Sequence, residues 1–260
     1  MVKPVEAIKV SGLSFDYPGK PVLKGINLAL SEGSFTAVLG PNGCGKTTLL
    51  KNISGYLKPR KGEIRVLNKS VPALNARERA RMIGYIPQNT AAGFDFTCHE
   101  VVSMGRLPYL GRFQWETTTD RKAVQKSMEL TGTWDLRNRL INNISGGEMQ
   151  RVLIARALAQ QPKVLLMDEP VSHLDIKFQM DIINLVGRLC NEVGITAVAV
   201  LHDINLASRY CSRIVLMKEG RIISTGSAAD VITEKNLKKV FDVEIEVLRP
   251  HCLVVPKPLN

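Results

Sequence analysis

The sequence contains no long apolar run. Near its middle, the longest uninterrupted apolar stretch covers only residues 197–201, whereas a helix that spans a bilayer needs about 20 apolar residues. The amino-terminal residues Met-Val-Lys-Pro-Val-Glu also lack the apolar stretch of a secretory signal. We therefore expect a chain that does not cross a membrane and that stays in the cytosol.

Cysteine is scarce and is not arranged in pairs. The five cysteines include no Cys-x-x-Cys pair, so they form no recognisable disulfide or zinc framework. Cys98-His99 and His251-Cys252 are adjacent pairs, but neighbours in an extended chain point in opposite directions. This geometry disfavours a metal site at either pair.

Acidic residues are outnumbered, and the formal net charge is +11, from 35 Lys and Arg against 24 Asp and Glu. Such an excess suits an acidic partner, namely a nucleotide, an anionic lipid surface or a nucleic acid, although solubility alone would also account for it. The chain has no tract of five or six like charges, no internal repeat and no low-complexity segment. Its length allows one large domain or two small ones with a buried core.

A glycine-rich segment organises the rest of the chain, Gly40-Pro41-Asn42-Gly43-Cys44-Gly45-Lys46-Thr47-Thr48. Its spacing is typical of loops whose backbone N–H groups surround phosphates, whose Lys reaches the terminal phosphates and whose hydroxyl holds magnesium. Residues 35–39 before it predict a buried strand, and residues 47–54 after it predict a helix that stops at Gly55. This order creates an anion site, and the context disfavours the alternative, a glycine-rich turn with a chance Lys-Thr.

The remaining pattern predicts an α/β fold. Alternating residues in segments 7–15 and 22–30 indicate an antiparallel β layer in front of the glycine loop, with a turn that places Tyr17 at a strand end. Buried strands at 163–167, 195–201 and 213–217 alternate with helices at 176–193 and 204–210, which predicts a parallel sheet covered by helices. Between these parts, residues 91–159 lack strand signals and are predicted to form an inserted helical subdomain.

Two adjacent carboxylates, Asp168 and Glu169, follow the apolar strand 163–167. Open α/β sheets place ligands at the carboxyl ends of their strands, so both should lie near the glycine loop. A carboxylate beside the loop threonine suits a hard magnesium ion, which makes Asp168 the expected metal ligand. Glu169 is then a candidate to orient or deprotonate an attacking water. The alternative is a pair of solvated acids in a loop.

His202 directly follows the strand 195–201. If that strand neighbours the one before Asp168, the imidazole could contact the terminal phosphate of a bound nucleotide. A lone histidine is more often structural, so this role depends on the strand order.

A second anion site is predicted at Ser145-Gly146-Gly147-Glu148. Ser145 and Glu148 fit a capping box that opens a helix, and that structural explanation accounts for both residues without a ligand. It does not account for the two glycines, which would expose backbone N–H groups at the positive end of the helix.

Taken together, these segments resemble the nucleotide-binding subunit of ABC transporters. The glycine loop resembles the Walker A motif of that family, residues 164–169 its Walker B motif with a catalytic glutamate, and Ser145-Gly146-Gly147-Glu148 its signature motif. Ile144 and Glu148 stand where Leu and Gln are commoner. The motifs occur in the family's order over residues 7–240. The resemblance implies a P-loop (RecA-like) core of residues 7–90 and 160–241, a helical subdomain at 91–159 and an extension at 242–260, all within one ABC ATPase domain.

The resemblance also implies site residues and cofactors, ATP and Mg²⁺. The catalytic residues would be Lys46, Glu169 and His202. Tyr17 would stack on adenine, Gln88 would lie in the Q-loop, and Asp175 would end the D-loop that starts at Ser172. The implied Mg²⁺ ligands are Thr47, Gln88 and Asp168. ATP would bind Tyr17, the glycine loop and Gln88 of one chain and, across a dimer, Ser145, Gly146, Gly147, Glu148 and Asp175 of the other.

The implied assembly is a head-to-tail homodimer that closes on ATP and moves two separate membrane-spanning permease subunits. The chain would lie at the cytoplasmic face of the cell membrane as a peripheral subunit, a substrate-binding protein would act on the assembly indirectly, and no nucleic acid is expected. The segment 101–111, with its Gly-Arg-x-Pro element at Gly105 to Pro108, is similar to ATPases of iron-siderophore, haem and cobalamin importers. Without that resemblance, the element is a plain turn with Arg106 on the surface.

Three hypotheses compete: an importer ATPase, an ABC-type ATPase that acts on nucleic acid or ribosomes, and a nucleotide-binding regulator without turnover. The absence of coiled-coil heptads and of a second cassette disfavours the second, and the presence of Glu169 and His202 disfavours the third. Cys44 lies at a predicted helix N-terminus, which would favour its thiolate and its alkylation. Val243, Ile245 and Val247 alternate in the carboxyl-terminal segment, which is expected to complete a β layer.

Overall fold

An antiparallel sheet forms the amino-terminal part of the fold. The computed structural model describes residues 5–88, 95–111, 115–248 and 252–256. In this first sheet the strand order is β2-β1-β4-β5, and all neighbouring strands are antiparallel. The strands are β1 (Glu6–Tyr17), β2 (Lys20–Ser31), β4 (Lys61–Val66) and β5 (Lys69–Ser70). The predicted β layer is therefore present, and Tyr17 ends β1.

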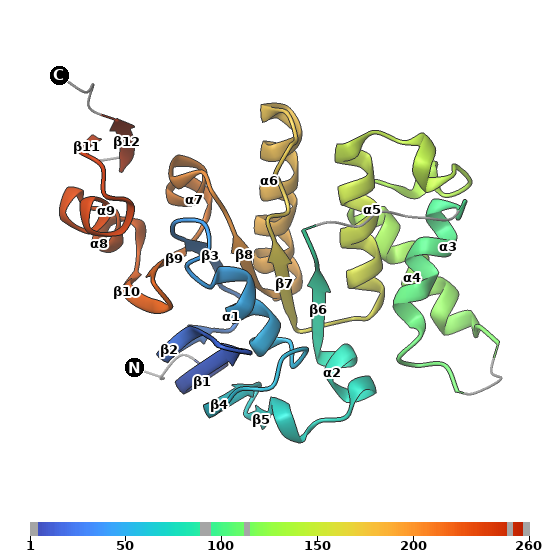
Figure 1. The fold of residues 1–260 in the computed structure, drawn as a ribbon. Coiled ribbons are helices and arrows are strands. Elements are labelled where there is room, and N and C mark those ends of the chain that lie inside the picture. Colours follow the sequence, from blue (N-terminus) through green and yellow to red (C-terminus); the bar gives the residue numbers. More distant parts are fainter. Residues whose placement is uncertain (1–4, 89–94, 112–114, 249–251, 257–260) are drawn as a thin grey trace.

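A mostly parallel sheet lies at the centre of the molecule, between the amino-terminal sheet and the longer helices (Figure 1). Its order is β10-β9-β3-β8-β7-β6, with β10 as an antiparallel edge strand. The strands β3, β7 and β8 are buried at every residue, which explains why they appear in the sequence as apolar runs rather than alternations. The strands are β3 (Phe35–Leu39), β6 (Ile83–Ile86), β7 (Val164–Asp168), β8 (Thr196–Val200), β9 (Arg213–Lys218) and β10 (Arg221–Gly226).

Helices and the first sheet cover opposite faces of this central sheet. Leu165 and Met167 of β7 pack in a cluster with α6 (Ile176–Val193), whereas Leu166 packs in a second cluster with α1 (Lys46–Ile53) and the amino-terminal sheet. Successive side chains of a strand point to opposite faces, so one strand contributes to both clusters. The other core helices are α2 (Ala76–Met82), α7 (Ile204–Tyr210), α8 (Ala228–Val231) and α9 (Glu234–Phe241), with a 3-10 helix at Val71–Ala73.

A group of helices lies beside β6, at the right of Figure 1. It contains α3 (Cys98–Ser103), α4 (Thr118–Leu130) and α5 (Gly146–Ala159), with 3-10 helices at Met104–Arg106, Trp134–Leu136 and Ile141–Asn143. These helices bury a cluster of their own, which includes Val102, Met128 and Val152. The predicted fold class, a parallel sheet with an antiparallel β layer and a helical insertion, is confirmed by this arrangement.

Arg106 is buried, so the plain-turn interpretation of the Gly-Arg-x-Pro element is wrong. Its side chain is only 3% exposed and donates from Nε to Asp120 Oδ1 at 2.9 Å and from Nη1 to the carbonyl of Ala159. Its guanidinium also lies 3.8 Å from the centre of the Tyr109 ring. The element therefore ties α4 to the end of α5 from inside.

The carboxyl-terminal segment forms a separate hairpin and does not extend either large sheet among the described residues, so the expectation of a completed β layer is wrong. The strands β11 (Ile245–Leu248) and β12 (Leu253–Pro256) pair with each other in an antiparallel ladder. Ile245, Val247 and Val254 pack against the core cluster that includes α7 and α9. Asn205 of α7 exchanges two hydrogen bonds with the backbone of Val254, which attaches the hairpin to a helix instead of a sheet edge.

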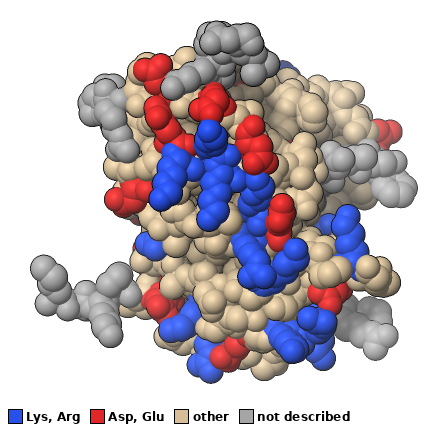
Figure 2. All heavy atoms as spheres, turned by 60° about the vertical axis from the view of Figure 1, so that its left-hand side comes forward, with Lys and Arg blue, Asp and Glu red and all other residues tan. Residues whose placement is uncertain are grey.

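The positive charge is distributed over the surface with acidic groups among it. Figure 2 shows a band of Lys and Arg side chains on one face, with Asp and Glu side chains beside them. Near the carboxyl-terminal helices, Lys218 pairs with Asp242 at 2.7 Å and Lys238 pairs with Glu244. In the described part of the chain, none of the helices combines the length and apolar character that a membrane crossing requires.

Candidate functional site

The glycine loop connects β3 to α1 and presents its backbone to a pocket of about 240 Å³. Gly43 and Gly45 have φ values of +75° and +105°, a region that favours glycine. Gly40 has no room for a side chain, because an added Cβ would overlap with the carbonyl of Met217. The pocket is lined by Tyr17, Lys20, Val22, Asn42, Gly43, Gly45, Lys46, Thr47, Thr48 and Glu169.

Lys46 is held back against this loop. Its Nζ donates to the carbonyls of Gly40 at 2.8 Å and of Pro41 at 3.1 Å, and the side chain is only 5% exposed. A buried ammonium group is stable only when it is paired or hydrogen-bonded. The loop thus carries a positive charge in addition to the N–H groups at the start of α1, and both favour an anion.

Asp168 lies at the end of β7, directly opposite the first turn of α1. Thr47 Oγ1 donates to Asp168 Oδ1 at 2.9 Å, and the Tyr85 hydroxyl donates to Asp168 Oδ2 at 3.4 Å. Burial raises the pKa of Asp168, and the nearby charge of Glu169 adds to the rise, while the hydrogen bond from Thr47 opposes it. Burial, with the negative charge of Asp168, also raises the pKa of Tyr85, so that its hydroxyl stays protonated and donates.

Glu169 has a left-handed backbone, with φ of +54°, and its carboxylate accepts three hydrogen bonds. His202 Nε2 donates to Oε1 at 2.8 Å, while Gln88 Nε2 and Ser172 Oγ donate to Oε2 at 2.7 and 3.0 Å. Burial raises the pKa of Glu169, but the hydrogen bonds from His202 and Ser172 outweigh it and hold the pKa below its ordinary value. Glu169 is therefore an ionised acceptor at neutral pH.

The structure thus gathers the glycine loop, Asp168, Glu169, His202 and Gln88 at one edge of the central sheet. The strand order β3-β8-β7-β6 is the reason, because it places the carboxyl ends of these four strands side by side. Tyr17 reaches the same pocket from the end of β1 and is 39% exposed, which leaves part of its ring open to a ligand.

The signature segment, Ser145 to Glu148, lies outside the glycine-loop pocket. Ser145 Oγ accepts from the N–H of Glu148 at 3.3 Å, and Glu148 Oε2 accepts from the N–H of Ser145 at 2.8 Å, so the predicted capping box is present at the start of α5. Asp175 caps α6 by accepting from the N–H of Phe178. Among the described residues that line the glycine-loop pocket, none comes from either helix.

Gly147 has a packing role that sequence reasoning missed. An added Cβ would overlap with the Phe178 ring of α6, whereas at Gly146 the nearest neighbour is Leu174 at 3.3 Å. Gly147 is buried and Gly146 is exposed. The first glycine is thus free to present its backbone, while the second lets α5 lie directly against α6.

Cys44 does not have the reactive character expected from its place in the sequence. Its side chain is only 4% exposed. Burial raises the pKa of the Cys44 thiol, although the charge of Lys46 acts in the opposite direction. The prediction of a favoured thiolate is wrong, because desolvation by burial outweighs the charge of Lys46 and the backbone hydrogen bonds that favour the thiolate.

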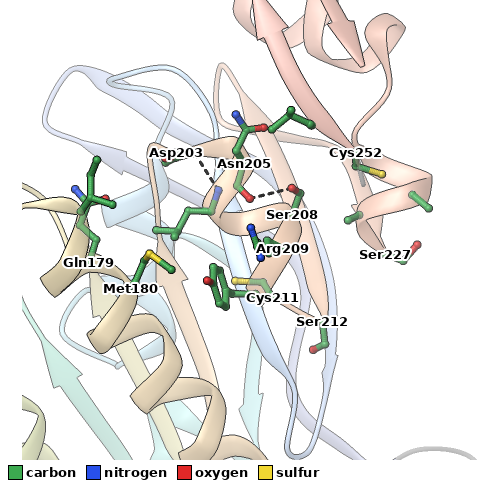
Figure 3. A pocket seen from close by; sticks show the side chains of 16 residues that line it. Gln179, Met180, Asp203, Asn205, Ser208, Arg209, Cys211, Ser212, Ser227 and Cys252 are labelled. Carbon is green, nitrogen blue, oxygen red and sulfur yellow. Dashed lines mark hydrogen bonds between the residues drawn. The ribbon is translucent and has the colours of Figure 1, made fainter. Parts of the chain in front are cut away.

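A larger pocket of about 990 Å³ lies between α6, α7 and the carboxyl-terminal hairpin (Figure 3). None of the site residues predicted from the sequence lines it. Three of its polar side chains are engaged within the protein: Asp203 caps α7, Asn205 binds β12, and Ser208 donates to the carbonyl of Asn205. The contact of Asn205 attaches α7 to the hairpin. The described residues that line this pocket include none of those that line the glycine-loop pocket.

Comparison with known proteins shows the family to which this chain belongs. The model of the ABC transporter family matches residues 23–172. Over 259 residues the chain is 33% identical to the ferric enterobactin transport ATP-binding protein FepC of Escherichia coli (strain K12), covering 100% of this chain and 93% of FepC. The chain belongs to the ABC transporter family. By family it is an ABC-type ATPase.

Other relatives of this family member share nearly its whole length. It is 34% identical to the iron(3+)-hydroxamate import ATP-binding protein FhuC of Bacillus subtilis (strain 168), covering 96% of this chain and 95% of FhuC. It is 38% identical to the uncharacterised ABC transporter ATP-binding protein YvrA of the same organism, covering 96% of this chain. The chain spans 58% of the length of YvrA.

Solved structures show the same fold. A chain of a transporter assigned to the metal-chelate type, in an inward-facing conformation, superposes with a TM-score of 0.85 at 27% identity, covering 98% of both chains. The bacterial ABC transporter cassette MJ0796, solved as a dimer, gives a TM-score of 0.72 at 33% identity, covering 85% of this ABC cassette and 98% of MJ0796.

Proposed function

We propose that this chain is the ATP-hydrolysing subunit of a membrane importer of the iron-siderophore, haem or cobalamin type. The main observation behind this proposal is that Thr47 at the start of α1 donates a hydrogen bond to Asp168, while Glu169 lines the glycine-loop pocket. The importer type is supported by similarity to FepC and FhuC over nearly the full length of all three chains.

The donor set at the glycine loop fits Mg²⁺. Thr47 and Asp168 offer a hydroxyl and a carboxylate oxygen 2.9 Å apart, and Mg²⁺ prefers such hard oxygen ligands together with water and substrate phosphates. Bound there, the ion would neutralise charge on the phosphates of ATP. We propose Gln88 as a further ligand through its amide oxygen, because its amide nitrogen is the atom that donates to Glu169.

Glu169 is proposed to orient the attacking water and accept its proton. A general base must lie within hydrogen-bond reach of the proton that it takes, and Glu169 lines the pocket with a side chain that is 15% exposed. His202, hydrogen-bonded to Glu169 and 44% exposed, is proposed to contact the terminal phosphate. Lys46, now bonded to loop carbonyls, would turn to the phosphates when they enter.

The signature and the D-loop are proposed to complete the site of a second copy. The residues proposed to act across the dimer all lie outside the glycine-loop pocket of their own chain: Ser145, Gly146, Gly147, Glu148 and Asp175. Ser145, Gly146 and Asp175 are exposed, whereas Glu148 is partly buried and Gly147 is buried. In a head-to-tail homodimer, the start of α5 would present N–H groups and a helix dipole to the phosphates held by the partner. The dimeric cassette MJ0796, at 33% identity, supports this assembly.

The remaining partners follow from the importer type. We propose two separate membrane-spanning permease subunits, a substrate-binding protein that acts on them indirectly, and a peripheral position at the cytoplasmic face of the membrane. ATP-driven closure of the homodimer would then move the permeases.

The test is capture of the tagged chain from the membranes of its own cells in mild detergent, with identification of its companions by mass spectrometry and an ATPase assay of the complex. We expect a polytopic membrane protein in near-equal amount and Mg²⁺-dependent hydrolysis. The tagged Glu169→Gln variant is the matched control and should recover the same companion with little turnover. Recovery of ribosomes, nucleic acid or nothing would leave the ATPase chemistry standing and overturn the importer assignment.

A further inference from the structure

Both carboxylates at the end of β7 are bonded to residues from one neighbouring segment. The strand β6 lies beside β7 with Tyr85 in register with Leu166. The Tyr85 hydroxyl donates to Asp168 Oδ2, and Gln88, three residues farther along, donates to Glu169 Oε2. Gln88 has a role in the proposed catalysis, whereas Tyr85 has none so far.

Tyr85 and Thr47 contact different oxygens of Asp168. Thr47 approaches Oδ1 from the start of α1, and Tyr85 approaches Oδ2 from β6. Two donors on opposite oxygens define the plane of a carboxylate, which a single donor would leave free to turn. Because Asp168 is only 2% exposed, few water molecules could replace either hydrogen-bond donor if it were removed.

We propose that Tyr85 is a positioning residue that holds the Asp168 carboxylate in the orientation required for Mg²⁺. The inference rests on the proposed metal-dependent function and extends it to a residue outside the recognised motifs. Hydrogen bonds to a ligating carboxylate fix its geometry, and loss of such a partner weakens metal affinity by about 10- to 100-fold. The distance of 3.4 Å is long for a hydrogen bond to oxygen, so the expected effect lies at about 10-fold.

The ring of Tyr85 has a separate role, because it packs against the core cluster between the central sheet and the amino-terminal sheet. Tyr85→Phe keeps the ring and removes only the hydroxyl, which separates positioning from packing. Tyr109→Phe is the matched control. It removes a hydroxyl that donates to the carbonyl of Gln160 at 2.8 Å, in the helical region and outside the glycine-loop pocket.

The experiment measures Mn²⁺ binding by electron paramagnetic resonance, with a non-hydrolysable ATP analogue bound to each protein. Nucleotide affinity is measured in parallel by fluorescence with all divalent ions chelated, and thermal unfolding confirms that each variant is folded. We expect the Mn²⁺ dissociation constant to rise about 10-fold in Tyr85→Phe and to stay at the wild-type value in Tyr109→Phe. Nucleotide affinity without metal should be the same in all three proteins.

Equal Mn²⁺ affinity in wild type and Tyr85→Phe would overturn the inference while leaving the proposed function intact. A matching loss of metal-free nucleotide affinity would also overturn it, because Tyr85 would then shape the pocket instead of orienting Asp168. If the wild-type complex held Mn²⁺ no more tightly than the free analogue, the proposed function itself would fail, and this inference with it.

Discussion

Replacement of Glu169 by Gln tests the proposed chemistry most directly. The substitution keeps the size of the side chain and removes its negative charge. The amide oxygen can still accept from Gln88 and Ser172, which share Oε2. The amide nitrogen then faces His202 Nε2, where the carboxylate accepts a hydrogen bond at 2.8 Å, and a change of imidazole tautomer restores a donor–acceptor pair. We therefore expect the fold and ATP binding to be retained.

Turnover should fall far more than stability. A positioned general base contributes about 10²- to 10⁴-fold, which corresponds to about 3 to 5 kcal/mol of activation free energy at ~1.36 kcal/mol per tenfold change. Because the site of each chain is proposed to be completed by its partner, ATP that cannot be hydrolysed should hold two chains together. The Glu169→Gln variant should thus accumulate as an ATP-bound dimer.

The assay combines phosphate release, ATP affinity by fluorescence and mass by light scattering, each with and without ATP. Glu129→Gln is the control, since Glu129 is an exposed residue of α4 whose side chain accepts a hydrogen bond from Gln125 Nε2, and it should behave as wild type. Unchanged phosphate release in Glu169→Gln would remove Glu169 from the role of base. Slow release without a dimer would instead refute the proposal that a second copy completes the site.

Three further outcomes follow from the packing. Arg106→Ala should lower the free energy of unfolding in urea by about 3 to 5 kcal/mol, because it removes the positive charge that pairs with the buried Asp120 carboxylate. Gly147→Ala should reduce ATPase activity and stability, because the new methyl group displaces α5 from α6, whereas Gly187→Ala, with open space around it, should stabilise α6 by up to about 1 kcal/mol. Cys44 should react with maleimide at pH 8 more slowly than a free cysteine, because its raised pKa leaves less thiolate.

Each of these three predictions has a matched control or a result that would contradict it. Arg65→Ala removes an exposed ion pair with Glu63 and should cost less than about 1 kcal/mol; an equal loss in the two arginine variants would show that burial of Arg106 is unimportant. Equal melting temperatures for the two glycine variants would contradict the packing argument. Maleimide labelling of Cys44 in the folded protein at the rate of a free thiol would restore the sequence-based prediction.

The pH dependence of stability tests the buried Asp120 carboxylate together with its partners Thr117 and Arg106. Hydrogen bonds from Thr117, together with the Arg106 contact, hold the pKa of Asp120 below its ordinary value, although burial opposes them. A carboxyl whose pKa is lowered in the folded state stabilises the protein above its unfolded pKa, near 3.8, and loses that contribution as the pH falls through the folded value. The difference in stability between wild type and Asp120→Asn should therefore narrow below about pH 4.

Local features of the fold could be read from the sequence because they depend on residues close together in the chain. The helix α6 begins after Asp175 and ends before Gly194, which has φ of +75°, as a capping residue and a terminal glycine predict. The capping box of α5 and the run of β3 were likewise predictable. The gathering of Lys46, Thr47 and Asp168 followed from the rule that parallel strands collect their carboxyl ends at one edge.

Only the tertiary structure determined which side chains contact one another at this edge of the sheet. The contact of Tyr85 with Asp168 joins residues 83 positions apart, and that of Gln88 with Glu169 joins residues 81 apart. Both depend on β6 lying next to β7, a pairing that no local pattern specifies. The burial of Arg106 and Cys44 was also invisible in the sequence, because it is produced by segments that pack from elsewhere. Sequence by itself thus determined the chemical groups and their strand ends, whereas the three-dimensional packing determined their partners, their solvation and hence their pKa values.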